Sequence, residues 1–448
     1  MVENLSELCK KAAEIISEIP PSTKIRLISH YDADGATAAA IISKALYRKG
    51  FDFHVTLMRN PFIQGLERVK KEENEFLIFS DMGSGLLKLI EDFKGKAIII
   101  DHHQYFRSTN RDDILQINAN NCGINGNYEA CGASLSYAFA LALSKENTDL
   151  SYLALTGIMG DKQYIGGIRG YNQTVLDDAI KSESVKLIKG LKFSEETLSD
   201  SLFYSVDPYF SGLSGNKDEI TDLLKNLRID ESKKIKEIDN KTLKKLHSYL
   251  VLKLLKKGCE KNIIDTVIRE RCWSDKVNLE LERFADLVDA CGKGGNRGLA
   301  LSLCMGDKDS FAEAKKVERN YKQKILDELL RIESEGVKET KSFRYFYTSN
   351  SSQGGVIGGI ATNFMLDIKK PLISLVRKDS EIHISSRGNQ HLVKNGLDLG
   401  AAMNEAAKQL GGQGGGHKIA AGATIGSDKE NEFLQIVDSI ITKQLSIY

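Results

Sequence analysis

Short apolar runs that end at acidic or imidazole side chains recur through the first third of the chain. Three of them occupy residues 25–29, 76–79 and 96–100, and each is long enough for one buried strand. Helical spacing of apolar positions follows the first two runs. Because strands that alternate with helices build parallel sheets, this pattern predicts an α/β fold with ligand sites at the carboxyl ends of its strands.

Side chains able to bind metal stand at these predicted strand ends. They are His30, Asp32 and Asp34, then Asp81, then Asp101, His102 and His103, with Asp161 after the apolar segment "SYLALTGIMG". Oxygen ligands with a few imidazoles and no thiolate suit Mn²⁺ or Mg²⁺ better than a structural zinc. Because converging carboxylates repel one another unless cations lie between them, we expect two divalent ions that activate water for hydrolysis. Each motif alone is weak, since polar turns are common, but their succession favours a metal centre.

The strand and helix pattern resumes near residue 343, after a charged helical stretch. "FRYFYTS", "PLISLV" and "EIHISS" predict strands, and "GGVIGGIATNFM" predicts a glycine-rich turn and helix. Arg387 follows the last of these strands, and a planar guanidinium suits a phosphate. The run "GGQGGG" would let backbone amides approach an anion, although a glycine run is more often a flexible loop.

Several segments together resemble one family. "HYDADG", "SDMG", "DHH" and "GD", in this order, resemble the four motifs of the DHH phosphoesterases, and within that superfamily the chain is similar to archaeal RecJ-type single-strand exonucleases. "GGQGGGHKIAAGA" resembles the glycine–histidine motif of the DHH-associated domain, and "DACGKGGNRGLALSLCMGD" resembles the RecJ "NAAGR" segment. The arginine of that segment aligns with Lys293, while Arg297 lies four residues further on, so the role of both stays open.

The resemblance implies a domain organisation. An N-terminal parallel-sheet DHH domain would span residues 1–190, and a helical middle segment with a connecting helix would span 191–335. A smaller C-terminal α/β DHH-associated domain would span 336–448. The active cleft would lie between the two sheet domains. The long helical pattern over 310–334 fits the connector, with a coiled-coil partner helix as the alternative.

The resemblance also implies a role for each candidate residue. His30 and Asp32 would hold one metal ion, Asp34, His102 and Asp161 would hold the other, and Asp81 would bridge them. His103 would face the scissile phosphate, and Asp101 would orient the imidazoles. The residues that would bind substrate in the associated domain are Arg387, Gly414, Gly415, Gly416 and His417.

Composition narrows the class of protein. The chain is 41% apolar and 27% charged, with 62 basic and 61 acidic residues, which is ordinary for a globular protein. Any basic surface for nucleic acid must therefore be local. Residues 233–257 hold nine lysines against two acids, which fits a phosphate backbone or the solvated face of an amphipathic helix. The seven cysteines form no CxxC pair, and no apolar run approaches the roughly 20 residues of a membrane span, so we expect a cytoplasmic protein.

The sequence thus predicts a processive, metal-dependent exonuclease acting on single-stranded DNA, RNA or both, in replication or repair. A short-oligonucleotide or dinucleotide phosphodiesterase is one alternative. A non-catalytic replication scaffold, which RecJ relatives have become in eukaryotic helicase assemblies, is another. The expected partners are single-stranded nucleic acid and replication proteins such as a GINS-type complex, for a monomer or homodimer. The polarity of digestion stays open.

Overall fold

The computed structural model describes residues 3–59, 62–72, 74–104, 107–192, 197–349 and 353–445. The chain forms two compact units, and each is built from two separate stretches of sequence. The first unit comprises 1–190 and 270–319, and the second comprises 191–269 and 320–448. The chain therefore leaves the first unit and later returns to it. The division into three domains at 190 and 335 stays a prediction.

A five-stranded parallel sheet forms the centre of the first unit, as the apolar runs predict. Its strands lie in the order β2-β1-β3-β4-β5, with bounds β1 (Ile25–His30), β2 (Phe53–Met58), β3 (Phe76–Ser80), β4 (Lys96–Asp101) and β5 (Ile114–Asn118). The three predicted strands are the inner ones. Because helices cover both faces of these strands, their sequences are continuous apolar runs rather than alternating patterns.

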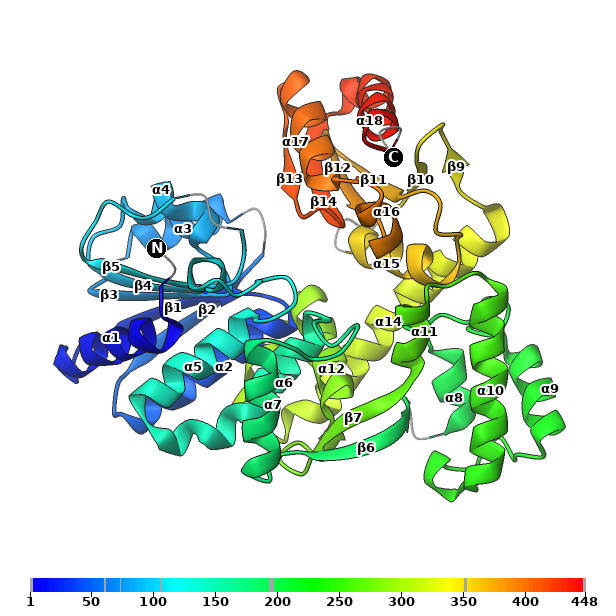
Figure 1. Cartoon of the computed structure of the whole chain (residues 1–448), viewed down its shortest axis with the longest axis horizontal. Helices are drawn as coiled ribbons and strands as arrows, with labels where there is room; N and C mark the ends of the chain where they lie inside the picture. Colours follow the sequence, from blue (N-terminus) through cyan, green and yellow to red (C-terminus); the bar gives the residue numbers. More distant parts are fainter. Residues whose placement is uncertain are drawn as a thin grey trace. The chain divides into compact units, whose positions relative to one another are not determined.

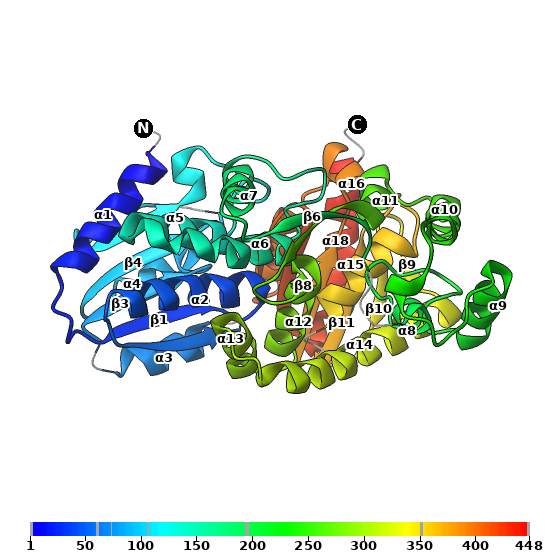
Figure 2. The same ribbon diagram turned by 90° about the horizontal axis from the view of Figure 1, so that it is seen from below.

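Helices cover both faces of this sheet (Figure 1). One layer contains α1 (Leu5–Glu18), α2 (Ala33–Arg48), α5 (Gly132–Leu143), α6 (Ser151–Gly160), α7 (Tyr171–Lys181), α12 (Leu281–Lys293) and α13 (Arg297–Met305). The other contains α3 (Ile63–Lys70) and α4 (Leu87–Ile90). In both views α3 and α5 lie on opposite faces (Figures 1 and 2). The two apolar cores that result hold the carboxyl edge of the sheet in place.

A six-stranded mixed sheet forms the core of the second unit. Its order is β13-β14-β12-β11-β10-β9, with bounds β9 (Lys338–Glu339), β10 (Arg344–Tyr347), β11 (Leu372–Lys378), β12 (Glu381–Arg387), β13 (Gln413–Gly416) and β14 (Ala420–Gly426). It packs with α15 (Gly354–Phe364), α16 (Gln390–Lys394), α17 (Leu399–Gln409) and α18 (Glu430–Leu445). Within the run "GGQGGG", residues Gln413–Gly416 form the edge strand β13, which pairs with β14. Backbone pairing therefore orders this glycine run.

The remaining elements are mostly helical, as the charged middle segment predicts. They are α8 (Leu198–Phe203), α9 (Lys217–Leu227), α10 (Asn240–Lys256), α11 (Lys261–Val267), the 26-residue α14 (Ser310–Glu335), and a small sheet of β6 (Lys186–Leu191), β7 (Ile268–Ser274) and β8 (Leu279–Glu280). In α10, Leu246, Leu250 and Leu254 are buried, and lysines such as Lys245 are exposed. None of the helices in the described ranges is long and apolar enough to cross a bilayer.

Candidate metal centre

The carboxyl edge of the five-stranded sheet brings together the eight candidate residues of the first unit. His30 ends β1, Asp32 caps the start of α2, and Asp34 lies in the first turn of that helix. Asp81 directly follows β3, Asp101 ends β4 and is followed by His102 and His103, and Asp161 caps the end of α6. Parallel strands direct their carboxyl ends to the same edge, which explains this convergence.

The potential ligands form three groups, and two of these contain Asp81. One group is His30, Asp32 and Asp81, a second is Asp34, His102 and Asp161, and a third is Asp81, His102 and His103; within each, the ligand atoms lie within 4.8 Å of one another. Asp81 Oδ2 lies 3.6 Å from His30 Nδ1, and its Oδ1 lies 3.1 Å from His102 Nε2. Asp81 therefore faces both His30 and His102, as a bridging ligand would.

The backbone at Asp81 is unusual. Its φ of +53° lies in the left-handed region, which aspartate tolerates better than most residues. The start of α5 closes over it, because a Cβ on Gly132 would lie 2.5 Å from Asp81 Cβ. Only glycine allows this approach.

Backbone amides at the start of α5 hold the carboxylate of Asp34. Gly132 N donates to Oδ2 at 2.7 Å, and Ala133 N donates to Oδ1 at 2.8 Å. The positive end of the helix dipole favours an anion there. Sequence reasoning missed these contacts, because the two partners lie 98 and 99 residues away from Asp34.

A buried glutamine links two of the candidate ligands. Gln163 Nε2 donates to Asp161 Oδ2 at 2.8 Å and to the Gly126 carbonyl at 2.9 Å. The same carbonyl lies 2.6 Å from His102 Nδ1, which must be the donor because a carbonyl only accepts. His102 therefore presents Nε2 to the carboxylates. Asn172 Nδ2 donates to Gln163 Oε1 at 2.6 Å. No sequence signal marked Gln163, since "DKQY" looks like an ordinary polar turn.

Asp101 lies behind the two histidines. Its Oδ1 accepts from His103 Nδ1 at 2.8 Å and from the backbone nitrogens of His102 and His103, while Oδ2 accepts from Ser84 N at 2.9 Å. Asp101 thus orients the ring of His103 but contacts only the backbone of His102, whose ring is oriented by Gly126. Burial disfavours its charge, but the nearby histidines outweigh burial and hold the pKa of Asp101 below its usual range.

The carboxylates at this edge lie close enough together to shift one another's pKa values. Burial and the carboxylates of Asp81 and Asp161 raise the pKa of Asp34 well above its usual value. Burial, with Asp81 and Asp32, raises the pKa of Asp161 to about 6 although His102 opposes the shift. Burial opposes charge on His102, but the surrounding carboxylates outweigh it and raise the pKa of the imidazole. Divalent cations would relieve this repulsion, and the oxygen-rich set suits Mn²⁺ or Mg²⁺.

The segment that contains Lys293 and Arg297 packs against the loop between β1 and α2, which carries Asp32. Asp289 accepts from Ala33 N at 3.1 Å and from Lys293 Nζ at 2.5 Å. The Arg297 guanidinium lies 5.9 Å from the centroid of the Tyr31 ring. This segment therefore supports the loop that carries Asp32 and Asp34.

The candidate substrate-binding residues gather at one end of the sheet in the second unit. Arg387 is the last residue of β12 and pairs with Ala420, while His417 N donates to the Ala420 carbonyl at 2.8 Å. Within the described residues the Arg387 side chain makes one hydrogen bond, to the Ser386 carbonyl at 2.8 Å, and no ion pair. A Cβ on Gly355, in the first turn of α15, would lie 2.5 Å from Arg387 Nη2. The guanidinium therefore lies against a glycine surface.

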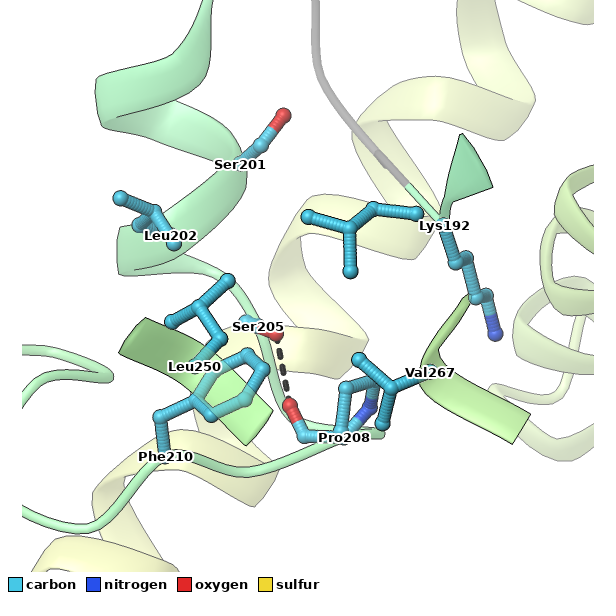
Figure 3. Close-up of a pocket in the computed structure, with 9 residues that line it drawn as sticks. Lys192, Ser201, Leu202, Ser205, Pro208, Phe210, Leu250 and Val267 are labelled. Atoms are coloured by element: carbon cyan, nitrogen blue, oxygen red, sulfur yellow. Dashed lines mark hydrogen bonds between the residues drawn. The ribbon is translucent and has the colours of Figure 1, made fainter. Parts of the chain in front are cut away.

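The second unit also contains a small pocket beside α8 and α10 (Figure 3). Its lining is largely apolar, and Ser205 Oγ donates to the Pro208 carbonyl at 2.6 Å. The lining residues include no carboxylate and no imidazole, so the pocket does not compete with the acidic cluster as a catalytic site.

Comparisons with known proteins agree with this architecture. Residues 24–158 match the DHH family, N-terminal domain, residues 342–443 match the DHHA1 domain, and residues 170–344 match Archaeal Cdc45. An uncharacterized protein of Methanocaldococcus jannaschii is 31% identical over 99% of this chain and 100% of its own length. The chain belongs to the DHH superfamily.

Solved structures of low identity share the fold. RecJ from Thermus thermophilus in complex with Mn²⁺ has a TM-score of 0.62 and 15% identity, covering 98% of this chain and 55% of that chain. The protein thus spans about half the length of that RecJ. CDC45 from Entamoeba histolytica has a TM-score of 0.68 and 12% identity, covering 99% of this chain and 100% of that chain.

Proposed function

We propose that the protein is a metal-dependent exonuclease that hydrolyses phosphodiester bonds in single-stranded DNA, RNA or both, during replication or repair. The observation that supports this most is the convergence of potential ligands in three adjoining groups, two of which contain Asp81. Membership of the DHH phosphoesterase family and the likeness to RecJ are consistent with a hydrolase.

Each residue of the cluster has a role in this proposal. His30, Asp32 and Asp81 would hold one divalent ion, and Asp34, His102 and Asp161 would hold the second, with Asp81 shared. The bound ions would activate water and stabilise charge on the phosphate. His103, with its side chain 42% exposed, is held through Nδ1 by Asp101, so Nε2 lies on the far side of the ring. We assign Nε2 to the scissile phosphate.

The second unit would bind the strand rather than cleave it. Arg387 offers a guanidinium with no carboxylate partner among the described residues, and burial lowers its pKa below the ordinary value. An arginine guanidinium keeps its charge in proteins. The amides of Gly414, Gly415 and Gly416 lie beside His417 on the edge strand β13, where a phosphate backbone would contact them.

Specific observations also favour a role as a replication scaffold. Residues 170–344 match Archaeal Cdc45, and the fold is similar to that of CDC45. Under this second candidate function the chain would bind replication proteins, such as a GINS-type complex. The clustered carboxylates distinguish the candidates, since a scaffold has no need for them.

Digestion of end-labelled single strands tests the exonuclease. DNA and RNA, each labelled at the 5′ or the 3′ end, are incubated with Mn²⁺, Mg²⁺, Ca²⁺ or EDTA, with a dinucleotide as a further substrate. We expect cleavage with Mn²⁺ or Mg²⁺ and none in EDTA or with Ca²⁺, which prefers more ligands at longer distances. The label released first gives the polarity. Cleavage in EDTA, or no cleavage with any metal, would contradict the proposal, and cleavage of the dinucleotide alone would favour the small phosphodiesterase.

A further inference from the structure

The loop that follows Asp161 carries an arginine to which neither the sequence motifs nor the acidic cluster give a role. Arg169 is exposed, and its guanidinium lies 5.0 Å from the centroid of the Tyr128 ring. Within the described ranges it makes no hydrogen bond and no ion pair. An arginine that stacks on an aromatic ring without a carboxylate partner keeps its donors available for an anion.

This loop is tied to the peptide that orients His102. At its start, Gln163 donates to the Gly126 carbonyl, which also accepts from His102 Nδ1. At its end, Asn172 N donates to the carbonyl of Glu129 at 2.9 Å. Both ends of the loop are therefore anchored to residues 126–129, the turn that also carries Tyr128.

Close packing leaves little freedom at the end of the loop beside Arg169. Gly170 has a φ of +60°, and a Cβ there would lie 2.4 Å from the Cβ of Glu129. Arg169 consequently lies on a loop that is bonded to residues 126–129, the turn that also orients His102 and that Gln163 links to Asp161. The loop therefore carries a cation on residues that are hydrogen-bonded to two candidate ligands, and cations of a nucleic-acid-binding surface contact the phosphates of the strand.

We propose that Arg169, stacked on Tyr128, binds a phosphate next to the scissile one in a single-stranded nucleic acid. The inference rests on the proposed function, because it assumes a nucleic-acid strand at the acidic cluster. It adds to that function a substrate contact within the first unit, separate from the metal ligands and from Arg387.

Arg169→Gln tests the contact, and Lys181→Gln is its matched control. Lys181 is exposed at the far end of α7, an 11-residue helix, so it lies about 15 Å further along the helix axis. Each variant is titrated with a fluorescein-labelled 12-nucleotide thymidine strand in Ca²⁺, and anisotropy is followed at several salt concentrations. We expect roughly ten- to a hundredfold weaker binding by Arg169→Gln. The slope of log binding constant against log salt concentration should decrease in magnitude by about 0.7, the value for one phosphate of a single strand.

The other variants sharpen this test. Arg169→Lys should recover the salt dependence but only part of the affinity, because lysine keeps the charge without the planar fork. Lys181→Gln should bind like the parent. Equal affinities and salt slopes for Arg169→Gln and the parent would overturn the inference, as would equal losses in Arg169→Gln and Lys181→Gln.

Hydrolysis of a small diester separates the inference from the function on which it rests. Bis(p-nitrophenyl) phosphate has one phosphate, so it makes no contact that needs a neighbouring one. With Mn²⁺, Arg169→Gln should lose at least about tenfold more kcat/KM on the oligonucleotide than on the diester. Equal losses on both substrates would refute a neighbouring-phosphate role. If the parent cleaves neither substrate, the proposed function fails, while the salt slopes of binding still decide the role of Arg169.

Discussion

The ring nitrogen Nδ1 of His103 lies 2.8 Å from Oδ1 of Asp101, a carboxylate that is almost completely buried. Because Asp101 fixes the ring, Asp101→Asn should reduce cleavage about ten- to a hundredfold with little change in KM. Steady-state kinetics of both single variants and of the double variant with His103→Ala check this. If Asp101 acts through His103, the double variant loses no more than His103→Ala alone. Additive losses would show that Asp101 acts elsewhere.

Asp81 belongs to two of the three ligand groups and lies 3.1 Å from His102 of the third, so its removal should affect the whole centre. We expect Asp81→Ala to lose metal-dependent cleavage by several orders of magnitude while the protein stays folded. Asp52→Ala is the control, since Asp52 is an exposed aspartate just before β2, at the opposite edge of the sheet. Cleavage with Mn²⁺ and circular dichroism are measured for both. Retained activity in purified Asp81→Ala would disprove a centre built around this residue.

Asp161 gives the metal-free protein a specific pH dependence. Its pKa is raised to about 6, so the folded state holds a proton that the unfolded state releases near pH 4. In EDTA this carboxylate should therefore lower the stability of the parent as pH rises from about 4 to 6. Asp161→Asn removes the effect. The Tm of the variant minus that of the parent should therefore increase as pH rises from 4 to 7. A constant difference in Tm over this range would contradict the prediction.

Gln163 should affect metal binding although it is not a proposed ligand. Gln163→Leu removes the donor shared by Asp161 and the Gly126 carbonyl, and we expect about ten- to a hundredfold weaker Mn²⁺ binding. Titration followed by electron paramagnetic resonance measures free Mn²⁺ directly. Gln173→Leu, at an exposed position of α7, is the control. A lower Tm with unchanged Mn²⁺ affinity would indicate a purely structural role.

Arg387 should contribute to binding more than to chemistry. Losing a charged hydrogen-bonding partner costs about 1.5–3 kcal/mol, so Arg387→Ala should weaken binding roughly ten- to a hundredfold, and His417→Ala should act in the same direction. Anisotropy in Ca²⁺ and cleavage in Mn²⁺ separate binding from kcat. Lys378→Ala, at the other end of the β11–β12 pair, should bind like the parent. A variant of Arg387 that binds normally but loses kcat by orders of magnitude would place this residue in the chemical step.

Features that depend on local pattern could be predicted from the sequence. A buried parallel strand needs a continuous apolar run, and its polar end is the next residue along the chain, so Asp81 and His102 could be located at a common sheet edge. The long helix α14 could be predicted equally well, since its apolar periodicity is local. The edge strands β2 and β5 were not predicted, because their apolar patterns are weaker.

The distant groups that support the site could be identified only from the folded chain. The amides of Gly132 and Ala133 reach Asp34, and Gln163 connects Asp161 to the turn that orients His102, through contacts that no periodicity encodes. The return of residues 270–319 to the first unit and the pairing of the glycine run as β13 are of the same kind. These features depend on backbone hydrogen bonds and close approach between segments far apart in the chain. Their free energy exists only once the surrounding core has formed.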